Sequence, residues 1–401
     1  MPAMRRQKNE SADSSMIIVI PCYKEPDIIQ TVRSLFDCER GDFPVEIILL
    51  INSHQIDSDE IIEINRKTYR EVSGFASANN TGSFFLTPVH VENLPGHQTG
   101  AGLPRKLGMD EAIRHFRNDK SGILVSLDAD CRVEKNYLTE IYRNFKEYDL
   151  NSATIAFRHS VENPNEADPL RQIIMQYEMY LHYYRSALEY CGYPYPYFTV
   201  GSAFAVTAET YVKAGGMGKQ QSGEDFYFLQ KVFPLGKTKF IDSTCVYPAA
   251  RTSDRVPFGT GPTLQKMLNE NTTVKMTYQL EAFKSLKMLF ENLDSFFKQP
   301  AETVGTFIKN LPEYLFIFLQ EDNFSEKISE INRHTATLLS FRKRFFDYFN
   351  AFKIVKYLNF VHPNYLAFKA VETQYSELEK RYPKPFYNFR YLLQNYKGVN
   401  V

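Results

Sequence analysis

The amino-acid sequence predicts an α/β fold with a mostly parallel central sheet, followed by a helical C-terminal extension. Two observations predict it. In the first half, short runs of apolar and β-branched residues alternate with segments whose apolar residues repeat at helical spacing, as in βαβ units. From about residue 263 the pattern is helical to the end, with prolines between the segments.

Each expected element follows from a local pattern. The runs MIIVI at 16–20 and VEIILLI at 45–51 are apolar throughout, as strands buried on both faces require. Pro26 suits the first turn of the helix that follows the first strand. The dipeptide Asp-Pro at 168–169 predicts the start of a helix over 170–190. The expected strands are 16–20, 45–51, 84–91, 123–127 and 198–206, and helices are expected at 28–36, 59–71 and 103–116.

The bulk composition excludes several classes of protein. The 401 residues are 43% hydrophobic, which is enough for one large domain with an extension or for two domains. Lys plus Arg equals Asp plus Glu at 47 each, so the basic excess of a nucleic-acid-binding protein is missing. Five scattered cysteines without a CxxC pair predict neither a disulfide framework nor a zinc site, and they favour a reducing compartment.

The expected organisation has three parts. Residues 1–15 are polar without an apolar core, which predicts a disordered leader rather than a secretory signal. An α/β domain is expected at 16–250, and a loop plus helical extension at 251–401. Because no run approaches about 18 apolar residues, we expect no transmembrane helix. The cysteine pattern and the missing secretory signal predict a cytoplasmic location, with a peripheral position at the inner face of the membrane as the alternative.

The strongest chemical feature is the pair Asp128 and Asp130, which comes directly after the apolar run ILVSL. Ligands of parallel sheets bind at the carboxyl ends of the strands. Two carboxylates one residue apart suit Mg²⁺ or Mn²⁺, which bridge to substrate phosphates. A second pair, Asp57 and Asp59, lies at the start of a polar helix, where helix capping explains it. One Asp-x-Asp pair is also expected by chance in a sequence of this composition, so chance explains the pair alone as well as a function does.

Four segments in order carry a resemblance to a known family. They are IIVIPCYKE at 17–25, GAGLPRKLG at 100–108, LDAD at 127–130 and GED at 223–225. In this order and spacing they resemble family 2 glycosyltransferases of the GT-A fold, over roughly residues 16–235. The resemblance implies transfer of a sugar from a nucleotide-sugar donor to a saccharide or lipid-linked acceptor.

The resemblance implies that Pro21, Tyr23 and Glu25 touch the nucleoside of the donor; the alternative is that the prolines only shape a strand-to-helix turn. Asn52 occupies the position where the family usually has the Asp that recognises the base. An amide offers different donors and acceptors from a carboxylate, so the base is left open.

By the same resemblance Arg105 binds the diphosphate, which agrees with the affinity of arginine and helix N-termini for phosphate. Asp128 contacts the ribose side of the donor, and Asp130, with Asp128 beside it, binds the divalent cation. A solvated basic helix start is the alternative for Arg105.

The acceptor side of the site is implied by the last segment. Asp225 is the expected general base of an inverting transferase, with Glu224 supporting the acceptor and Gly201 in a small-residue strand beside it. Both acidic residues also suit the N-terminal turn of a helix, whose dipole they compensate. A retaining reaction stays open.

Arg251 and Arg255, followed by glycines, suit a loop that closes on a diphosphate, or else a surface linker between domains.

Other functions stay as alternatives. A sugar-phosphate nucleotidyltransferase needs a Gly-rich loop after the first strand, where this chain has PCYKEPD. A non-catalytic nucleotide-sugar-binding or scaffold protein is the third hypothesis. A processive membrane synthase is disfavoured because the chain has no Trp for the Gln-x-x-Arg-Trp motif. The basic and aromatic segment 341–346 suits peripheral membrane contact, or a helix with a buried aromatic face.

Overall fold

The computed structural model describes residues 4–6, 15–96, 100–116, 120–160, 168–220, 223–252 and 259–382. The chain divides into two compact units. The first contains residues 1–163 and 197–266, and the second contains residues 164–196 and 267–401. The segment 164–196, expected within the α/β domain, therefore groups with the C-terminal helices. Its helix packs against two helices of that unit, α9 (Leu280–Glu291) and α15 (Val371–Arg381).

The first unit is built on one sheet with the strand order β1-β4-β3-β2-β5-β8-β7-β9-β6. The pairings make six of these nine described strands run in one direction, while β1, β6 and β8 run against them. The fold class is thus confirmed: α/β with a mostly parallel central sheet and C-terminal helices. The strands are β1 (Met4–Arg6), β2 (Met16–Cys22), β3 (Val45–His54), β4 (Phe84–Leu94), β5 (Ile123–Ser126), β6 (Cys131–Val133), β7 (Ser152–Phe157), β8 (Phe204–Thr207) and β9 (Thr238–Pro248).

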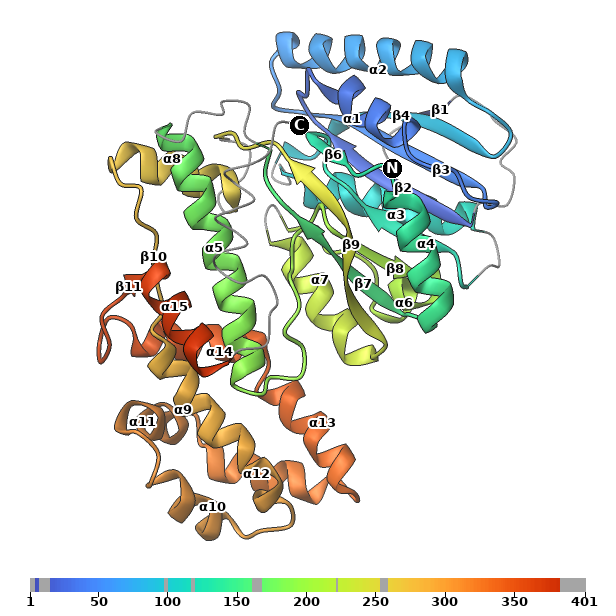
Figure 1. Cartoon of the computed structure of the whole chain (residues 1–401). Coiled ribbons are helices and arrows are strands. Elements are labelled where there is room, and N and C mark those ends of the chain that lie inside the picture. The colour runs from blue at the N-terminus through green and yellow to red at the C-terminus, as the bar shows by residue number, and fades with distance from the viewer. Residues whose placement is uncertain are drawn as a thin grey trace. The chain divides into compact units, whose positions relative to one another are not determined.

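Helices cover both faces of this sheet (Figure 1). Every residue of β3 is buried, which explains why its sequence is apolar without alternation. Helix α2 packs on β3 and β4, and α3 packs on β2 and β3. The helices of the first unit are α1 (Ile28–Phe36), α2 (Asp59–Asn79), α3 (Gly102–His115), α4 (Tyr137–Tyr148), α6 (Ala208–Lys213) and α7 (Glu224–Val232), and α8 (Thr260–Asn269) crosses into the second unit.

The strand order creates a topological switch point between β2 and β5. From β2 the chain moves outward to β3 and β4, and then returns to place β5 on the other side of β2. The connections that leave β2 and β5 therefore diverge at their carboxyl ends. Such divergence opens the crevice in which ligands of open α/β sheets bind.

Two expected elements need correction. The strand expected at 198–206 begins only at Phe204, because a turn closes before it through a 3.0 Å bond from the Ala203 N–H to the Val200 carbonyl. The helix expected at 59–71 runs on to Asn79.

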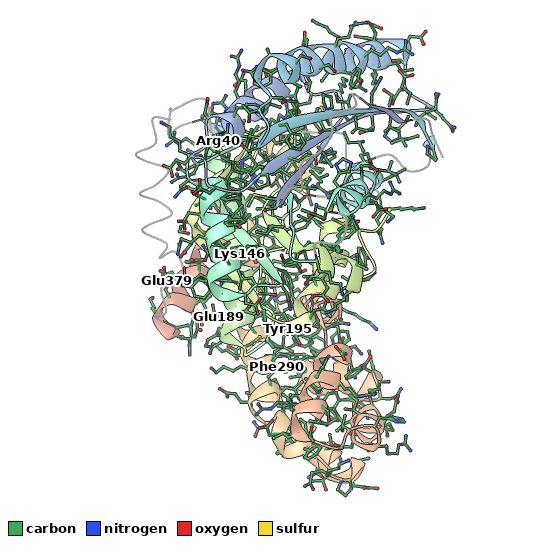
Figure 2. All side chains as sticks on the ribbon, turned by 90° about the vertical axis from the view of Figure 1, so that its right-hand side faces the viewer. Arg40, Lys146, Glu189, Tyr195, Phe290 and Glu379 are labelled. Carbon is green, nitrogen blue, oxygen red and sulfur yellow. The ribbon has the colours of Figure 1, made fainter. Side chains whose placement is uncertain are left out.

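The second unit is helical, and its aromatic residues form a core. Phe341 and Phe345 are fully buried, whereas Arg342 between them is exposed and pairs with Asp294. Phe290, labelled in Figure 2, meets Phe349 edge to face at 5.5 Å between ring centroids. The unit contains α5 (Pro169–Tyr190), α9, α10 (Ala301–Ile308), α11 (Glu313–Glu321), α12 (Phe324–Arg333), α13 (Leu338–Tyr348), α14 (Ala351–Val361), α15, and the short strands β10 (Met276–Thr277) and β11 (Lys369–Ala370). No helix in the described part of the chain is long and apolar enough to cross a membrane.

A buried ion network ties α3 to the sheet. Glu46 of β3 and Glu111 of α3 are both nearly inaccessible to solvent, and His115 bonds to both. Its Nδ1 lies 2.9 Å from a Glu46 carboxylate oxygen, and its Nε2 lies 3.2 Å from one of Glu111. Both ring nitrogens can donate to carboxylates only in the imidazolium form. The hydrogen bonds to Glu111 and Glu46 accordingly raise the pKa of His115 to about 9.

This network makes stability depend on pH. A raised folded-state pKa means that the stabilisation is complete below the unfolded value near 6.5 and is lost as pH rises through about 9. We expect His115→Gln to lower stability by about 2–3 kcal/mol at pH 6.5 and by much less at pH 10. Thermal melts of both proteins across this range test it, with the exposed His334→Gln variant as control. Parallel melting curves for wild type and His115→Gln at every pH would contradict the assignment.

Candidate functional site

The sequence-predicted residues gather at the carboxyl ends of the strands around the switch point. Pro21 is the next-to-last residue of β2, and Tyr23 and Glu25 follow that strand. Asn52 lies near the end of β3, and Asp128 follows β5. Segments far apart in the sequence are thus brought to one edge of the sheet.

Arg105 of α3 is the centre of a buried cluster. The residue is 2% exposed, and its guanidinium donates to four protein acceptors. They are the Asp128 carboxylate at 2.8 Å, the Glu224 carboxylate at 3.3 Å, the Ser126 hydroxyl at 2.7 Å and the Gly201 carbonyl at 3.0 Å. These acceptors come from the end of β5, the turn before β8, and the start of α7. Arg105 therefore joins three separate segments of the site through hydrogen bonds inside the protein.

Asp225 stands beside this cluster at the N-terminus of α7. The Phe226 N–H donates to its carboxylate at 2.7 Å. Burial raises the pKa of Asp225 to about 7, and the neighbouring Glu224 carboxylate adds to the effect, while Arg105 opposes it. A Cβ at Gly201 would lie 3.1 Å from an Asp225 carboxylate oxygen and 3.0 Å from Arg105. A larger residue at this position would require one of these two side chains to shift by a few tenths of an ångström.

A second arginine forms a separate cluster with Asp130 and Glu25. Arg251, after β9, donates to Asp130 at 3.0 Å and to Glu25 through both of its terminal nitrogens, at 3.1 Å for the longer bond. The Glu25 side chain is fully buried, and Asp130 is 28% exposed. Arg255, expected in the same loop, lies outside the described residues.

A third polar cluster follows β2 and β3, and sequence reasoning missed half of it. The Tyr23 hydroxyl donates to Asp57 at 2.7 Å, and the other Asp57 oxygen accepts from the His54 N–H at 2.6 Å. The His54 ring meets that of Tyr23 edge on and lies 3.2 Å from the Asn52 amide nitrogen. Helix capping belongs to Ser58, which accepts from the Ile61 N–H, so Asp57 is left to fix the Tyr23 turn. The sequence signal that could have identified His54 and Asp57 is their position at or just after the end of β3.

Two polar atoms in this third cluster lack partners. Asn52 Oδ1 and His54 Nδ1 are buried and make no hydrogen bond to any described residue. Because the Asn52 amide nitrogen donates to His54 Nε2, the neutral imidazole carries its proton on Nδ1. The cluster thus holds one unpaired acceptor beside one unpaired donor. Buried polar groups normally have partners, so this pair suits a polar ligand or a water molecule.

The acidic residues fit a divalent cation only in combination with a substrate. No group of three or more His, Cys, Asp or Glu side chains that could hold a metal is found among the residues described. Asp128 and Asp130 supply hard oxygens, and each already accepts from an arginine. Mg²⁺ is commonly held by one or two carboxylates together with substrate phosphates. The donor set fits that arrangement and does not fit a metal site made by the described residues alone.

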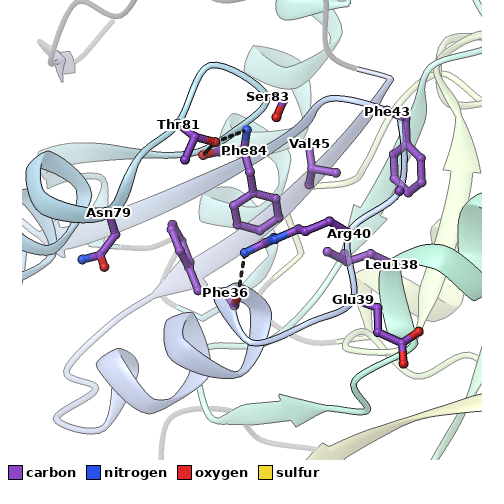
Figure 3. A pocket seen from close by; sticks show the side chains of 11 residues that line it. Phe36, Glu39, Arg40, Phe43, Val45, Asn79, Thr81, Ser83, Phe84 and Leu138 are labelled. Atoms are coloured by element: carbon purple, nitrogen blue, oxygen red, sulfur yellow. Dashed lines mark hydrogen bonds between the residues drawn. The ribbon is translucent and has the colours of Figure 1, made fainter.

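A pocket of about 180 Å³ lies at the opposite edge of the sheet, where β3 and β4 begin (Figure 3). Phe36 and Phe84 line it, and the Arg40 guanidinium stacks over the Phe84 ring at 3.3 Å from its centroid. Arg40 also donates to the Phe36 carbonyl. None of the predicted site residues lines this pocket.

Comparisons with known proteins do not assign this chain to a family. No family model and no curated protein matches the chain. Solved structures similar to it include TarS from S. aureus in complex with UDP-GlcNAc, at 13% identity and a TM-score of 0.40, covering 80% of this chain and 91% of that one. Another is a mannosyltransferase from Pyrobaculum calidifontis in complex with GDP-Man and Mn²⁺, at 15% identity and 0.36, covering 62% and 61%. A third is GalNAc-T7 with UDP, GalNAc and Mn²⁺, at 13% identity and 0.36, covering 60% and 44%. At these identities and TM-scores the similarity assigns no function to the chain.

Proposed function

We propose that this protein is a glycosyltransferase that moves a sugar from a nucleoside-diphosphate sugar to an acceptor hydroxyl with inversion. The observation that supports the proposal is the meeting of Asp128, Glu224 and Asp225 around one buried arginine at the switch point of the sheet. A donor with a charged diphosphate needs cations and hard oxygens, and an acceptor hydroxyl needs a base. We propose that the carboxylates at the switch point supply both the hard oxygens for the donor side and the base for the acceptor.

Asp225 is the proposed general base. Its carboxylate removes the proton of the acceptor hydroxyl while the acceptor oxygen forms its bond to the anomeric carbon. The bond from that carbon to the diphosphate oxygen breaks, and its electron pair leaves with the nucleoside diphosphate. Attack from the face opposite the leaving group inverts the configuration. A carboxyl with a pKa of about 7 is well matched to such a transfer near neutral pH.

Asp128 and Asp130 are the proposed ligands of Mg²⁺ or Mn²⁺, with the diphosphate oxygens completing the coordination. A divalent cation bound there would stabilise the negative charge that develops on the leaving group. Tyr23 and Asn52 are proposed to face the nucleoside, where the unpaired Asn52 oxygen and His54 Nδ1–H offer one acceptor and one donor to a base edge.

Arg105 takes a different role from the one that the resemblance implies. Its hydrogen bonds go to Asp128, Glu224, Ser126 and Gly201, so it is proposed as a positioning residue and not as a phosphate ligand. By holding Asp128 and Glu224 together it fixes the donor side of the site relative to the start of α7. Preorganised groups of this kind need no rearrangement during the reaction.

Thermal stabilisation by nucleotides tests the proposed function. A ligand that binds only the folded state raises the melting temperature, and at 100 times its Kd contributes about 2.7 kcal/mol. We expect UDP, GDP, ADP or TDP with Mn²⁺ to raise Tm by about 5 °C or more. The shift should disappear in Asp130→Asn and persist in the exposed control Asp242→Asn. A well-folded protein whose Tm no nucleotide changes would favour the scaffold alternative.

A further inference from the structure

We propose that Arg251 acts as an internal cation that occupies the Asp130 side of the site and makes divalent-cation binding conditional on a nucleoside diphosphate. The inference rests on the proposed function. It concerns the order in which ligands enter and not the chemistry of transfer.

The contacts of Arg251 carry this inference. Its two terminal nitrogens bond to both oxygens of Glu25, and one of them also donates to Asp130 at 3.0 Å. The Glu25 side chain has no exposed surface. A fully buried carboxylate is tolerated only when a charge or several hydrogen bonds compensate it, so Glu25 holds the guanidinium strongly in place. The one guanidinium is shared by two carboxylates, and it offsets part of the charge of Asp130 before any ligand arrives.

The backbone around Arg251 fixes this arrangement. The Ala249 N–H donates to the Asp130 carbonyl at 3.2 Å, and the Ala250 N–H donates to the Ser160 carbonyl at 3.1 Å. On the other side, the Thr31 hydroxyl donates to the Ala129 carbonyl at 2.8 Å. The segment that carries Arg251 and the turn that carries Asp130 are thus tied to each other and to α1. The guanidinium reaches Asp130 from an anchored position.

Repulsion between the Arg251 guanidinium and a divalent cation sets the order in which the cation and the nucleotide bind. A divalent cation approaching Asp130 alone meets the positive guanidinium bonded to the same carboxylate, which disfavours entry. A diphosphate brings oxygens that pair with arginine and also complete the coordination of the cation. Once the diphosphate oxygens also accept hydrogen bonds from Arg251, the Asp130 carboxylate can ligate the cation. Cation and nucleotide should therefore strengthen each other's binding by the same factor.

Direct measurement of Mn²⁺ binding by electron paramagnetic resonance tests this inference, because free and bound Mn²⁺ are counted without any turnover. For the wild type we expect UDP, GDP, ADP or TDP to tighten Mn²⁺ binding by about tenfold or more. In Arg251→Gln, Mn²⁺ alone should bind about tenfold tighter than to the wild type, and the nucleotide should add less. Arg66→Gln, which removes an exposed arginine paired with Glu92, is the matched control and should bind Mn²⁺ as the wild type does.

Two results would overturn the inference. One is wild-type protein whose Tm a nucleotide raises but which binds Mn²⁺ equally well with and without that nucleotide, a measurement that needs no variant to fold. The other is Arg251→Gln with a wild-type melting curve and no gain in Mn²⁺ affinity. The gain should also vanish in the double variant Arg251→Gln, Asp130→Asn. If Arg251→Gln gains Mn²⁺ affinity but no nucleotide binds to either protein, the internal-cation role stands and the proposed function fails.

Discussion

Replacing Asp225 by Asn is expected to lower kcat for sugar transfer by about a thousandfold, within the range of about 10²–10⁴ typical of a lost general base. The amide keeps the shape of the carboxylate but cannot accept the proton of the acceptor hydroxyl. Binding of the nucleoside diphosphate should change little, because the proposed donor contacts come from the ends of β2, β3 and β5 and not from α7. Release of nucleoside diphosphate from the sugar donor, measured with a panel of saccharide acceptors, gives the rate.

The pH profile of the wild type gives a second test of the same residue. Because burial raises the pKa of Asp225 to about 7, the ionised and active fraction halves near that pH and falls roughly tenfold for each lower unit. The profile of kcat/KM should therefore drop below pH 7, and this limb should be missing from the residual activity of Asp225→Asn. Asp242→Asn is the control, since that exposed aspartate of β9 lies outside the site. Full activity in Asp225→Asn would remove it from the mechanism.

Replacing Arg105 by Met is expected to destabilise the first unit by about 3–5 kcal/mol, the usual result of removing one partner from a buried ion cluster. The change leaves the Glu224 carboxylate buried at 4% exposure without its cation, and leaves the Gly201 carbonyl without this donor. A fall of about 10 °C in Tm should accompany it. Arg105→Lys should recover little, because a single ammonium cannot replace the planar fork that spans these acceptors.

The same variants separate the two roles considered for Arg105. If it were a phosphate ligand, Arg105→Met would melt as the wild type does and would lose only nucleotide binding. If it positions Asp128 and Glu224, stability and activity fall together, and Ser126→Ala reproduces a smaller part of the loss in stability. Arg66→Met is the matched control, since the Arg66 side chain is 50% exposed and its ion pair with Glu92 contributes little.

Local patterns in the amino-acid sequence were sufficient to predict the fold class and the edge of the sheet where the candidate site residues gather. Strands such as β3 are buried on both faces, so their apolar runs are visible without knowledge of their neighbours. The start of α5 was also predictable, because the Asp168 side chain accepts from the Leu170 N–H, two residues away. Asp128 and Asp130 follow their strand directly, and the chain connectivity alone places them at the carboxyl edge. Each of these features depends on interactions between residues close in sequence.

Which side chains meet could be seen only in the folded chain. Arg105 reaches Glu224, and Arg251 reaches Glu25, across separations of more than a hundred residues. The role of Asp57, which looked like part of a helix cap, depends on the Tyr23 hydroxyl from the segment after another strand. The grouping of residues 164–196 with the C-terminal helices depends likewise on packing between distant segments. Such contacts are set by the strand order and by the burial of charge, and neither is encoded in a local pattern.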